Sequence, residues 1–172
     1  RGEMIWCQLF SEPGAGSDLA SLTTKATKVD GGWRITGQKI WTTGAQFSQW
    51  GALLARTDPS APKHNGITYF LLDMSSAGVE VKPLRELTGN AMFNTVFIDD
   101  VFVPDEDVVG EPNSGWTVAR ATLGNERVSI GGGAGIAGVD PRALVSVVAE
   151  HGDRLAGAKI RTGNFIADDH AM

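Results

Sequence analysis

Apolar and polar residues alternate along much of the chain between residues 23 and 103, a pattern typical of β-strands with one buried face. Residues 24–29 and 33–36 alternate in this way on either side of Asp30-Gly31-Gly32. This turn sequence predicts that the two stretches are strands of a hairpin, because glycine readily adopts the positive φ that tight turns need. Further strands are predicted at residues 39–43, 52–56, 67–73, 79–82 and 94–103. Successive short strands without helices between them favour a β-sandwich or β-barrel over a parallel sheet.

The pattern changes after Pro112. Apolar residues then recur at helical spacing and predict a helix over residues 114–130. Asp140-Pro141 has the composition of a helix start, so a second helix is predicted over residues 142–150, and a similar pattern predicts a third over residues 154–172. Strands first and helices afterwards predict an α+β chain. We expect a β-domain over residues 1–111 and the beginning of a helical domain over residues 112–172. The abrupt start and end of the sequence indicate a fragment of a longer protein.

The composition excludes several classes of protein. The chain has 172 residues and a formal net charge of −5, and without a basic block this charge argues against a nucleic-acid partner. Cys7 is the single cysteine, which excludes an internal disulfide and a multi-cysteine metal site, and the histidines lack metal-ligand spacing, so no metal is expected. No apolar run reaches the roughly 18 residues of a membrane span, and no signal peptide is recognisable. These features predict a cytoplasmic globular protein.

Two stretches have a composition suited to binding a ligand. The first, residues 6–18, has proline, glycines, serines and acidic residues directly after an apolar run. Its glycines would let a ligand approach the backbone, although the same composition also fits a surface loop that follows a strand. The second, residues 37–45, puts Trp41 and two threonines before a glycine turn. Such a tryptophan is able to stack on a flat ring, or it belongs to the core at the end of a strand.

Taken together, these two stretches closely resemble the acyl-CoA dehydrogenase family. The resemblance is carried by the string from Cys7 to Asp18, by Gly37-Gln38-Lys39-Ile40-Trp41-Thr42-Thr43, and by residues 99–106 with Gly115-Trp116 and Asn125-Glu126-Arg127 beyond them. It covers about residues 4–130. It implies the family's middle domain, an antiparallel β-barrel expected here from about residue 4 to 109, followed by the first helices of the C-terminal bundle.

The resemblance implies FAD as cofactor and oxidation of an acyl-CoA thioester to a 2-enoyl-CoA. Residues 8–11 would lie along the flavin ring, Trp41 would cover the flavin face away from substrate, and Thr43 would bond near the reactive ring nitrogen. The complete set implied for the cofactor is Gln8, Phe10, Ser11, Ser17, Trp41 and Thr43, and the set implied for the substrate is Ser17, Asn125 and Arg127.

Glu126 is the candidate catalytic base. Dehydrogenation requires a carboxylate that removes the α-proton while a hydride leaves the β-carbon. Glu126 falls on the apolar stripe of the predicted helix, where burial would raise its pKa and make it a stronger base. Two alternatives remain at the level of the sequence: the base lies beyond Met172, or Glu126 pairs with Arg127 or Arg120.

The resemblance also implies partners and rival activities. An electron-transfer flavoprotein would accept the electrons, and the full-length protein would be a homo-oligomer. An acyl-CoA oxidase, which passes the electrons to oxygen, is the nearest alternative. A flavin-bearing, DNA-associated relative is the alternative from another class, and the acidic net charge disfavours it.

Overall fold

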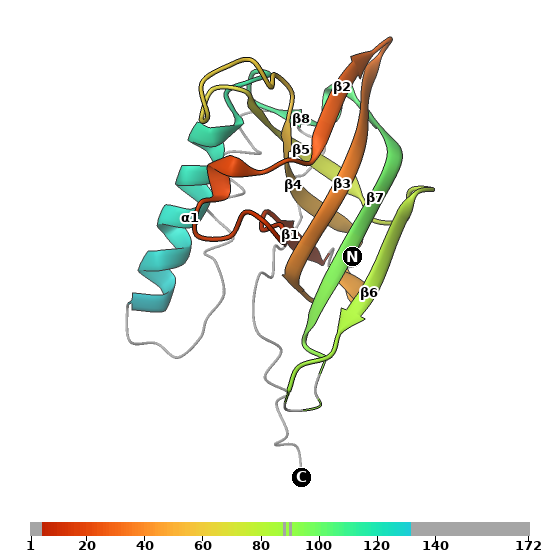
Figure 1. The fold of residues 1–172 in the computed structure, drawn as a ribbon, viewed down its shortest axis with the longest axis vertical. Coiled ribbons are helices and arrows are strands. Elements are labelled where there is room, and N and C mark those ends of the chain that lie inside the picture. Colours follow the sequence, from red (N-terminus) through yellow and green to blue (C-terminus); the bar gives the residue numbers. More distant parts are fainter. Residues whose placement is uncertain (1–4, 88, 90, 132–172) are drawn as a thin grey trace, which may run out of the picture.

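The computed structural model of the protein describes residues 5–87, 89 and 91–131, and for residues 124–131 it describes the backbone alone. This part of the chain forms strands, short 3-10 helices and one α-helix (Figure 1). The strands are β1 (Trp6–Leu9), β2 (Lys25–Val29), β3 (Gly32–Thr43), β4 (Trp50–Arg56), β5 (Ile67–Asp73), β6 (Val79–Leu84), β7 (Phe93–Pro104) and β8 (Val108–Val109). The helices are η1 (Leu19–Ser21), η2 (Ala45–Phe47), η3 (Asp105–Asp107) and α1 (Gly115–Gly131).

The strands form one mixed sheet of eight strands. Seven of them follow the order β6-β7-β3-β2-β4-β5-β8, and β1 pairs with β4 off this path. Most neighbours are antiparallel, but β1 and β2 both run parallel to β4. The expected antiparallel pairing is therefore corrected to mixed pairing. Among the described residues, no pairing joins the end strands β6 and β8 to close a barrel. Alternation indicates which side chains a strand buries, but it does not identify the strand's partner or its direction.

The sheet buries side chains on both of its faces. Along β4 and β5, Leu54 and Tyr69 belong to one core cluster, while Leu53 and Phe70 belong to the other. The first cluster is closed by α1, where Ala119 is buried, and the second lies between β4, β5 and the long strands β3 and β7. The sheet thus curves around the second cluster, and α1 covers the opposite face near β5 (Figure 1).

The structure confirms the predicted hairpin. β2 and β3 pair antiparallel, with Val29 opposite Gly32, and Gly31 makes the turn with a φ of 72°. The strands predicted over residues 33–36 and 39–43 are one continuous strand, β3, because two irregularities in its register against β7 do not end it. β8 was not predicted from the sequence, since two residues carry no readable alternation.

The helix predicted over residues 114–130 is confirmed as α1. Before α1, the helices of the described residues are 3-10 helices of three residues each. The helices predicted over residues 142–150 and 154–172 lie outside the described residues. None of the helices in the described ranges is long and apolar enough to cross a membrane.

Candidate functional site

The two stretches whose composition suits ligand binding, residues 6–18 and 37–45, contact each other in the structure. The backbone N–H of Ile40 donates to the carbonyl oxygen of Ser11 at 2.9 Å, so the segment after β1 lies directly against β3. Beyond Ser11 the chain reverses, and Glu12 and Ala15 exchange two backbone hydrogen bonds of 3.0 Å. The loop is therefore shaped by its own backbone and held on the strand that carries Trp41.

Trp41 has the most unusual backbone of the site. Its φ is 61°, in the left-handed region that costs a non-glycine residue roughly 1–2 kcal/mol. It lies at the register irregularity between Lys39 and Thr42, where β3 leaves its regular pairing with β7. The indole is 57% exposed and touches Phe93 edge-on, with ring centroids 5.7 Å apart and planes at 82°. A large apolar ring is thus turned outward at a strained position, which is a common property of functional sites.

The chain is fixed again directly after Trp41. The buried Asn94 side chain donates to the Thr42 carbonyl oxygen at 3.0 Å and to Gln46 Oε1 at 2.5 Å. Thr42 Oγ1 and Asn94 Oδ1 are both buried without a hydrogen-bond partner in the described structure. Buried polar atoms are normally satisfied, so two such oxygens beside an exposed indole indicate that water or a ligand completes this region.

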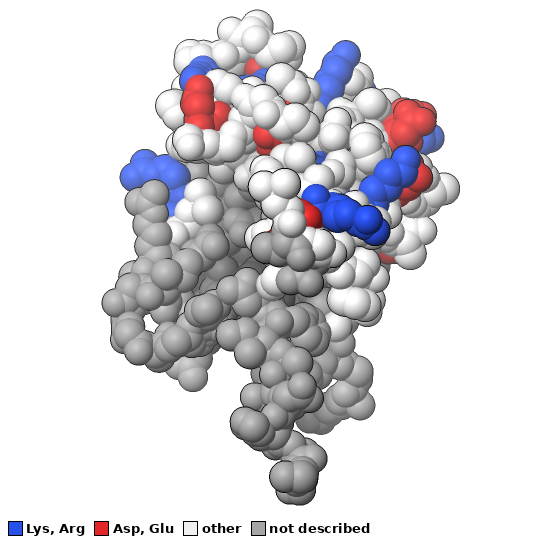
Figure 2. Space-filling model, turned by 60° about the horizontal axis from the view of Figure 1, so that its bottom comes forward, with Lys and Arg blue, Asp and Glu red and all other residues white. Residues whose placement is uncertain are grey.

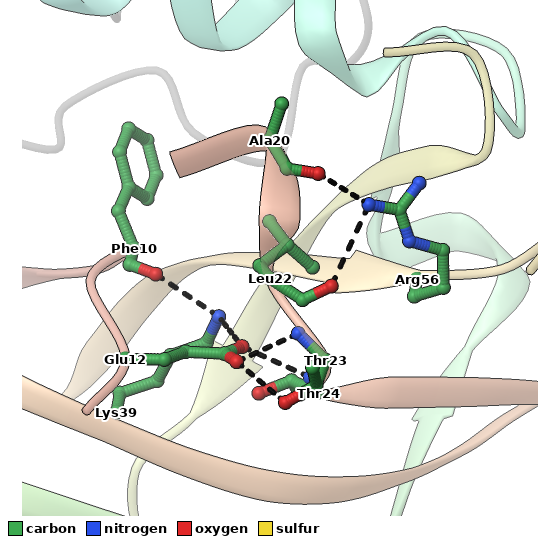
Figure 3. A network of polar contacts seen from close by, with 8 residues as sticks. All are labelled: Phe10, Glu12, Ala20, Leu22, Thr23, Thr24, Lys39 and Arg56. Atoms are coloured by element: carbon green, nitrogen blue, oxygen red, sulfur yellow. Dashed lines mark hydrogen bonds and ion pairs between the residues drawn. The ribbon is translucent and has the colours of Figure 1, made fainter. Parts of the chain in front are cut away.

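A buried ion pair involves Lys39, which lies two positions before Trp41 on β3. Lys39 is fully buried, and its Nζ lies 2.8 Å from Glu12 Oε1 and 3.1 Å from the carbonyl oxygen of Phe10 (Figure 3). The Glu12 carboxylate also accepts the N–H of Thr23 at 2.6 Å, the Thr23 hydroxyl at 2.8 Å and the N–H of Thr24 at 2.9 Å. Each buried charge therefore has an opposite charge and further hydrogen bonds, as such groups require.

The protonation of this pair follows from burial and from its partners. Burial alone raises the pKa of Glu12, but the Lys39 charge and the hydrogen bonds outweigh it and lower that pKa to about 2. Burial lowers the pKa of Lys39 to about 8, against the opposing effect of the Glu12 charge. Both groups remain charged near neutral pH, so the contact is an ion pair under ordinary conditions.

The segment that follows the loop is held from two directions. Arg56 Nη2 donates to the carbonyl oxygens of Ala20 at 2.5 Å and Leu22 at 3.5 Å, while Glu12 accepts the next two backbone N–H groups (Figure 3). Gly37 on β3 lies so close to this segment that a Cβ there would be 2.4 Å from Thr24 Oγ1. The loop, this segment and β3 therefore form one tightly connected unit.

The structure places the other residues implied for the cofactor at different depths. Gln8 is partly buried on β1, on the face that also carries Trp6 and Phe10. The Phe10 ring is buried and packs edge-on against Tyr69, so a ligand could reach this residue only through its backbone. Thr43 is partly buried at the end of β3.

Ser17 is exposed on the outer part of the loop. The next residue, Asp18, pairs with Lys63 and accepts a hydrogen bond from Ser21 at 2.6 Å, which ties this part of the loop to the turn between β4 and β5. Ser11 thus contacts β3 next to Trp41, while Gln8 lies on β1, Thr43 at the end of β3 and Ser17 on the outer part of the loop.

Asn125, Glu126 and Arg127 lie in the second half of α1. Their side chains are outside the described part of the structure. The roles of Glu126 as base and of Asn125 and Arg127 in substrate binding therefore remain predictions.

Charged side chains on the described surface are mixed in sign. In the view of Figure 2, several Lys and Arg side chains lie beside acidic ones, with uncharged residues between such groups. The exposed ion pairs include Lys28 with Asp105 and Lys82 with Glu80. Among the described residues, no group of three or more His, Cys, Asp or Glu side chains is arranged to hold a metal ion.

Sequence reasoning missed the Glu12–Lys39 pair, although one signal was present. Lys39 is in phase with the buried positions Trp33 and Ile35 on the alternating pattern of β3. A lysine at an inward position of a strand requires a buried partner. Nothing in the sequence indicated that this partner is the glutamate of the loop.

Parts of several known proteins are similar in sequence to this chain. Residues 7–101 match the family model described as acyl-CoA dehydrogenase, middle domain. The chain is 66% identical over 133 residues to acyl-CoA dehydrogenase FadE34 of Mycobacterium tuberculosis, covering 77% of this chain and 19% of the relative. It is 49% identical over 123 residues to acyl-CoA dehydrogenase IpdE1 of the same organism, covering 72% and 32% of the two proteins.

Solved structures show the same relationship. The structure titled Tcur3481-Tcur3483 steroid ACAD is similar with a TM-score of 0.69 and 38% identity, over 74% of this chain and 33% of that chain. A glutaryl-coenzyme A dehydrogenase bound to glutaryl-CoA shares the fold, with a TM-score of 0.69 at 24% identity over 84% of this chain and 35% of that chain. The chain thus spans about a fifth to a third of the curated relatives named above. From the family model and these identities, the chain belongs to the acyl-CoA dehydrogenase family and contains its middle domain.

Proposed function

We propose that the protein containing this chain catalyses the FAD-dependent α,β-dehydrogenation of an acyl-CoA thioester to a 2-enoyl-CoA. The observation that carries the proposal is the outward, left-handed Trp41 next to the loop at Ser11, in a chain of this family. A strained backbone that presents a wide ring beside hydroxyl groups is suited to a flat heteroaromatic ligand.

The residues present fit a bound flavin. The exposed Trp41 indole offers a stacking face, and the hydroxyl groups of Ser11 and Thr43 are able to donate to ring heteroatoms. The unpartnered oxygen of Thr42 lies in the same short stretch of β3. Phe10 would contribute backbone groups only, and Gln8 a side-chain amide from β1.

The proposed reaction divides the work between cofactor and protein. Bound FAD supplies the acceptor for the hydride that leaves the β-carbon. Trp41, Ser11 and Thr43 would hold and orient the ring and exclude water from one of its faces. Glu126 would take the α-proton onto its carboxylate, and Asn125, Arg127 and Ser17 would bind the acyl-CoA. The domain division near residue 112 is part of this proposal, because it places the base and the cofactor contacts on different domains.

The substrate and partners are proposed at the level of chemical class. The substrate is an acyl-CoA, and because a 38% identical neighbour is titled a steroid ACAD, a steroid-bearing thioester belongs beside straight-chain thioesters in a substrate panel. An electron-transfer flavoprotein is the proposed electron acceptor. We propose a homo-oligomer; a relative that is 33% identical is titled the ChsE4-ChsE5 complex, so a complex of two different chains is the competing outcome.

The experiment measures cofactor content and flavin reduction in the full-length protein. Purified protein should carry FAD, and its flavin absorbance should bleach when an acyl-CoA of the panel is added without oxygen. A 2-enoyl-CoA should form in equal amount. Rapid reoxidation by air with release of hydrogen peroxide would instead indicate an acyl-CoA oxidase, and a protein without flavin would contradict the proposal.

A further inference from the structure

The buried pair of Glu12 and Lys39 occupies a particular place in the proposed cofactor site. Lys39 lies two positions before Trp41 on β3, and its ammonium contacts the Phe10 carbonyl oxygen and the Glu12 carboxylate of the loop. The next residue, Ile40, donates to the Ser11 carbonyl oxygen. Three consecutive loop residues are therefore bound to two consecutive strand residues, directly beside the strained tryptophan.

These contacts differ from those that hold an ordinary strand pair. A regular ladder is made of backbone hydrogen bonds, whereas here a buried charge inside the β-sheet replaces an apolar side chain. Apolar residues of similar volume often stabilise a fold as well as a buried ion pair does, so stability alone does not require a charge at this position. The ammonium does something an apolar side chain could not do, because it binds a carbonyl oxygen and a carboxylate of the loop at once.

We infer that Glu12 and Lys39 are positioning residues that set the loop at Ser11 in place against Trp41, and thereby preorganise the FAD site. This inference rests on the proposed function for the identity of the ligand. In the described part of the structure neither side chain has a hydrogen bond to the Trp41 indole or to the Ser11 hydroxyl, so the pair acts through the backbone of Phe10, Ser11 and Ile40. Sites held by such supporting contacts lose affinity when the support is removed, even though every ligand-binding group is still present.

The test compares Lys39→Met with a control on the same strand. Ile35→Ala is the control, because Ile35 is also fully buried on β3 but belongs to the core cluster that contains none of the loop residues 10–18. Both variants are made in the full-length protein, and a thermal midpoint is recorded for each. Two further readouts are taken: hydrogen exchange of the Ile40 amide in apoprotein, and the dissociation constant for FAD from fluorescence titration.

Lys39→Met should accelerate exchange at Ile40 and raise the FAD dissociation constant, each by about tenfold or more, which corresponds to the loss of one or two hydrogen bonds. Ile35→Ala should lower the thermal midpoint while leaving both quantities within about threefold of the unchanged protein. The inference is overturned if, in both variants, the loss of FAD affinity is in the same proportion to the fall in the thermal midpoint. It is also overturned if Lys39→Met leaves the Ile40 amide protected.

If Lys39→Met does not fold, Thr23→Val is used in its place to test the inference. Thr23 is exposed, and its hydroxyl donates to Glu12 Oε2 at 2.8 Å, so the substitution loosens the carboxylate without leaving a buried charge unpaired. The FAD dissociation constant should then rise roughly threefold, as expected for one partly exposed hydrogen bond. An unchanged constant in this variant overturns the inference.

The outcomes separate this inference from the proposed function. If the unchanged protein does not bind FAD, the proposed function is wrong, and Ile40 exchange still reports whether the pair tethers the loop. If Trp41→Ala weakens FAD binding but Lys39→Met does not, the cofactor assignment stands and the positioning role is refuted.

Discussion

The ammonium of Lys39 lies 2.8 Å from the carboxylate of Glu12, and both side chains are buried between a loop and a strand that are far apart in sequence. The pair joins the end of the segment after β1 to the middle of β3. Both residues belong to the stretches that resemble the family, yet neither is among the residues that the resemblance implied for the cofactor or the substrate. Their contribution is to the arrangement of the residues beside them.

Glu12→Gln should destabilise the protein by about 3–5 kcal/mol, because it leaves the Lys39 charge buried without an opposite charge. The measurement is the free energy of unfolding from denaturant titration. Asp105→Asn is the matched control, since it removes the exposed partner of Lys28 and should cost less than about 1 kcal/mol. Equal losses in the two variants would show that the buried pair is no more important than a surface contact.

Stability should fall in acid because of Glu12. Its pKa is about 2 in the folded protein against 4.5 for an ordinary glutamate, so the folded state favours the carboxylate. The stabilisation is present above pH 4.5 and is lost as pH falls towards 2; for a shift of this size it is on the order of 3 kcal/mol. The free energy of unfolding measured between pH 6 and pH 2 should show this loss, with about one proton taken up on unfolding. In Glu12→Gln this component should be absent, and an unchanged acid profile would assign the loss to other carboxylates.

The strained backbone at Trp41 predicts that glycine is tolerated better than alanine at this position, which is the reverse of the usual order of stability. Inside a helix or strand, glycine normally makes a protein less stable than alanine does, by roughly 0.5–1 kcal/mol. At a φ of 61° alanine has a cost of about 1–2 kcal/mol that glycine avoids. Trp41→Gly should therefore be more stable than Trp41→Ala by about 0.5–1 kcal/mol, measured by thermal or denaturant unfolding. The usual order would mean that the backbone relaxes once the indole is gone.

FAD retention should depend on Trp41 and Thr43. Removing the indole in Trp41→Ala should cost roughly 0.5–1.5 kcal/mol of binding beyond the buried area, and Thr43→Ala about 1 kcal/mol for one hydrogen bond. The flavin content after purification and the FAD dissociation constant measure both effects. Phe102→Ala is a suitable control, because Phe102 is also an exposed aromatic residue on the sheet but lies on β7, paired with Arg34. Unchanged flavin content in both site variants would refute the cofactor assignment.

Glu126→Gln tests the predicted catalytic base. The substitution keeps the shape of the side chain and removes its ability to accept the α-proton, so flavin reduction by acyl-CoA should slow by about 10²–10⁴-fold. Binding of the substrate should change little. Stopped-flow bleaching of the flavin separates the two steps. A slower rate by less than about tenfold, together with weaker substrate binding, would place the base elsewhere and make Glu126 a partner of an arginine.

Much of the local structure could be predicted from the sequence. The turn at Asp30-Gly31-Gly32, the strand over residues 67–73 and the helix that became α1 follow from short-range rules of turn chemistry and side-chain periodicity. The two stretches around residues 6–18 and 37–45 were recognised as one family signature from their residues alone, and the family match confirms it.

Other features were decided by tertiary structure. The parallel pairing of β1 with β4 depends on how two distant strands pack, which alternation along either strand does not encode. The contact of Ser11 with Ile40 and the left-handed backbone of Trp41 likewise arise only after β3 has been placed between β7 and the loop. Periodicity is a local property of the chain, whereas the partner of a buried charge such as Lys39 is chosen by whichever distant group the folded core brings within reach.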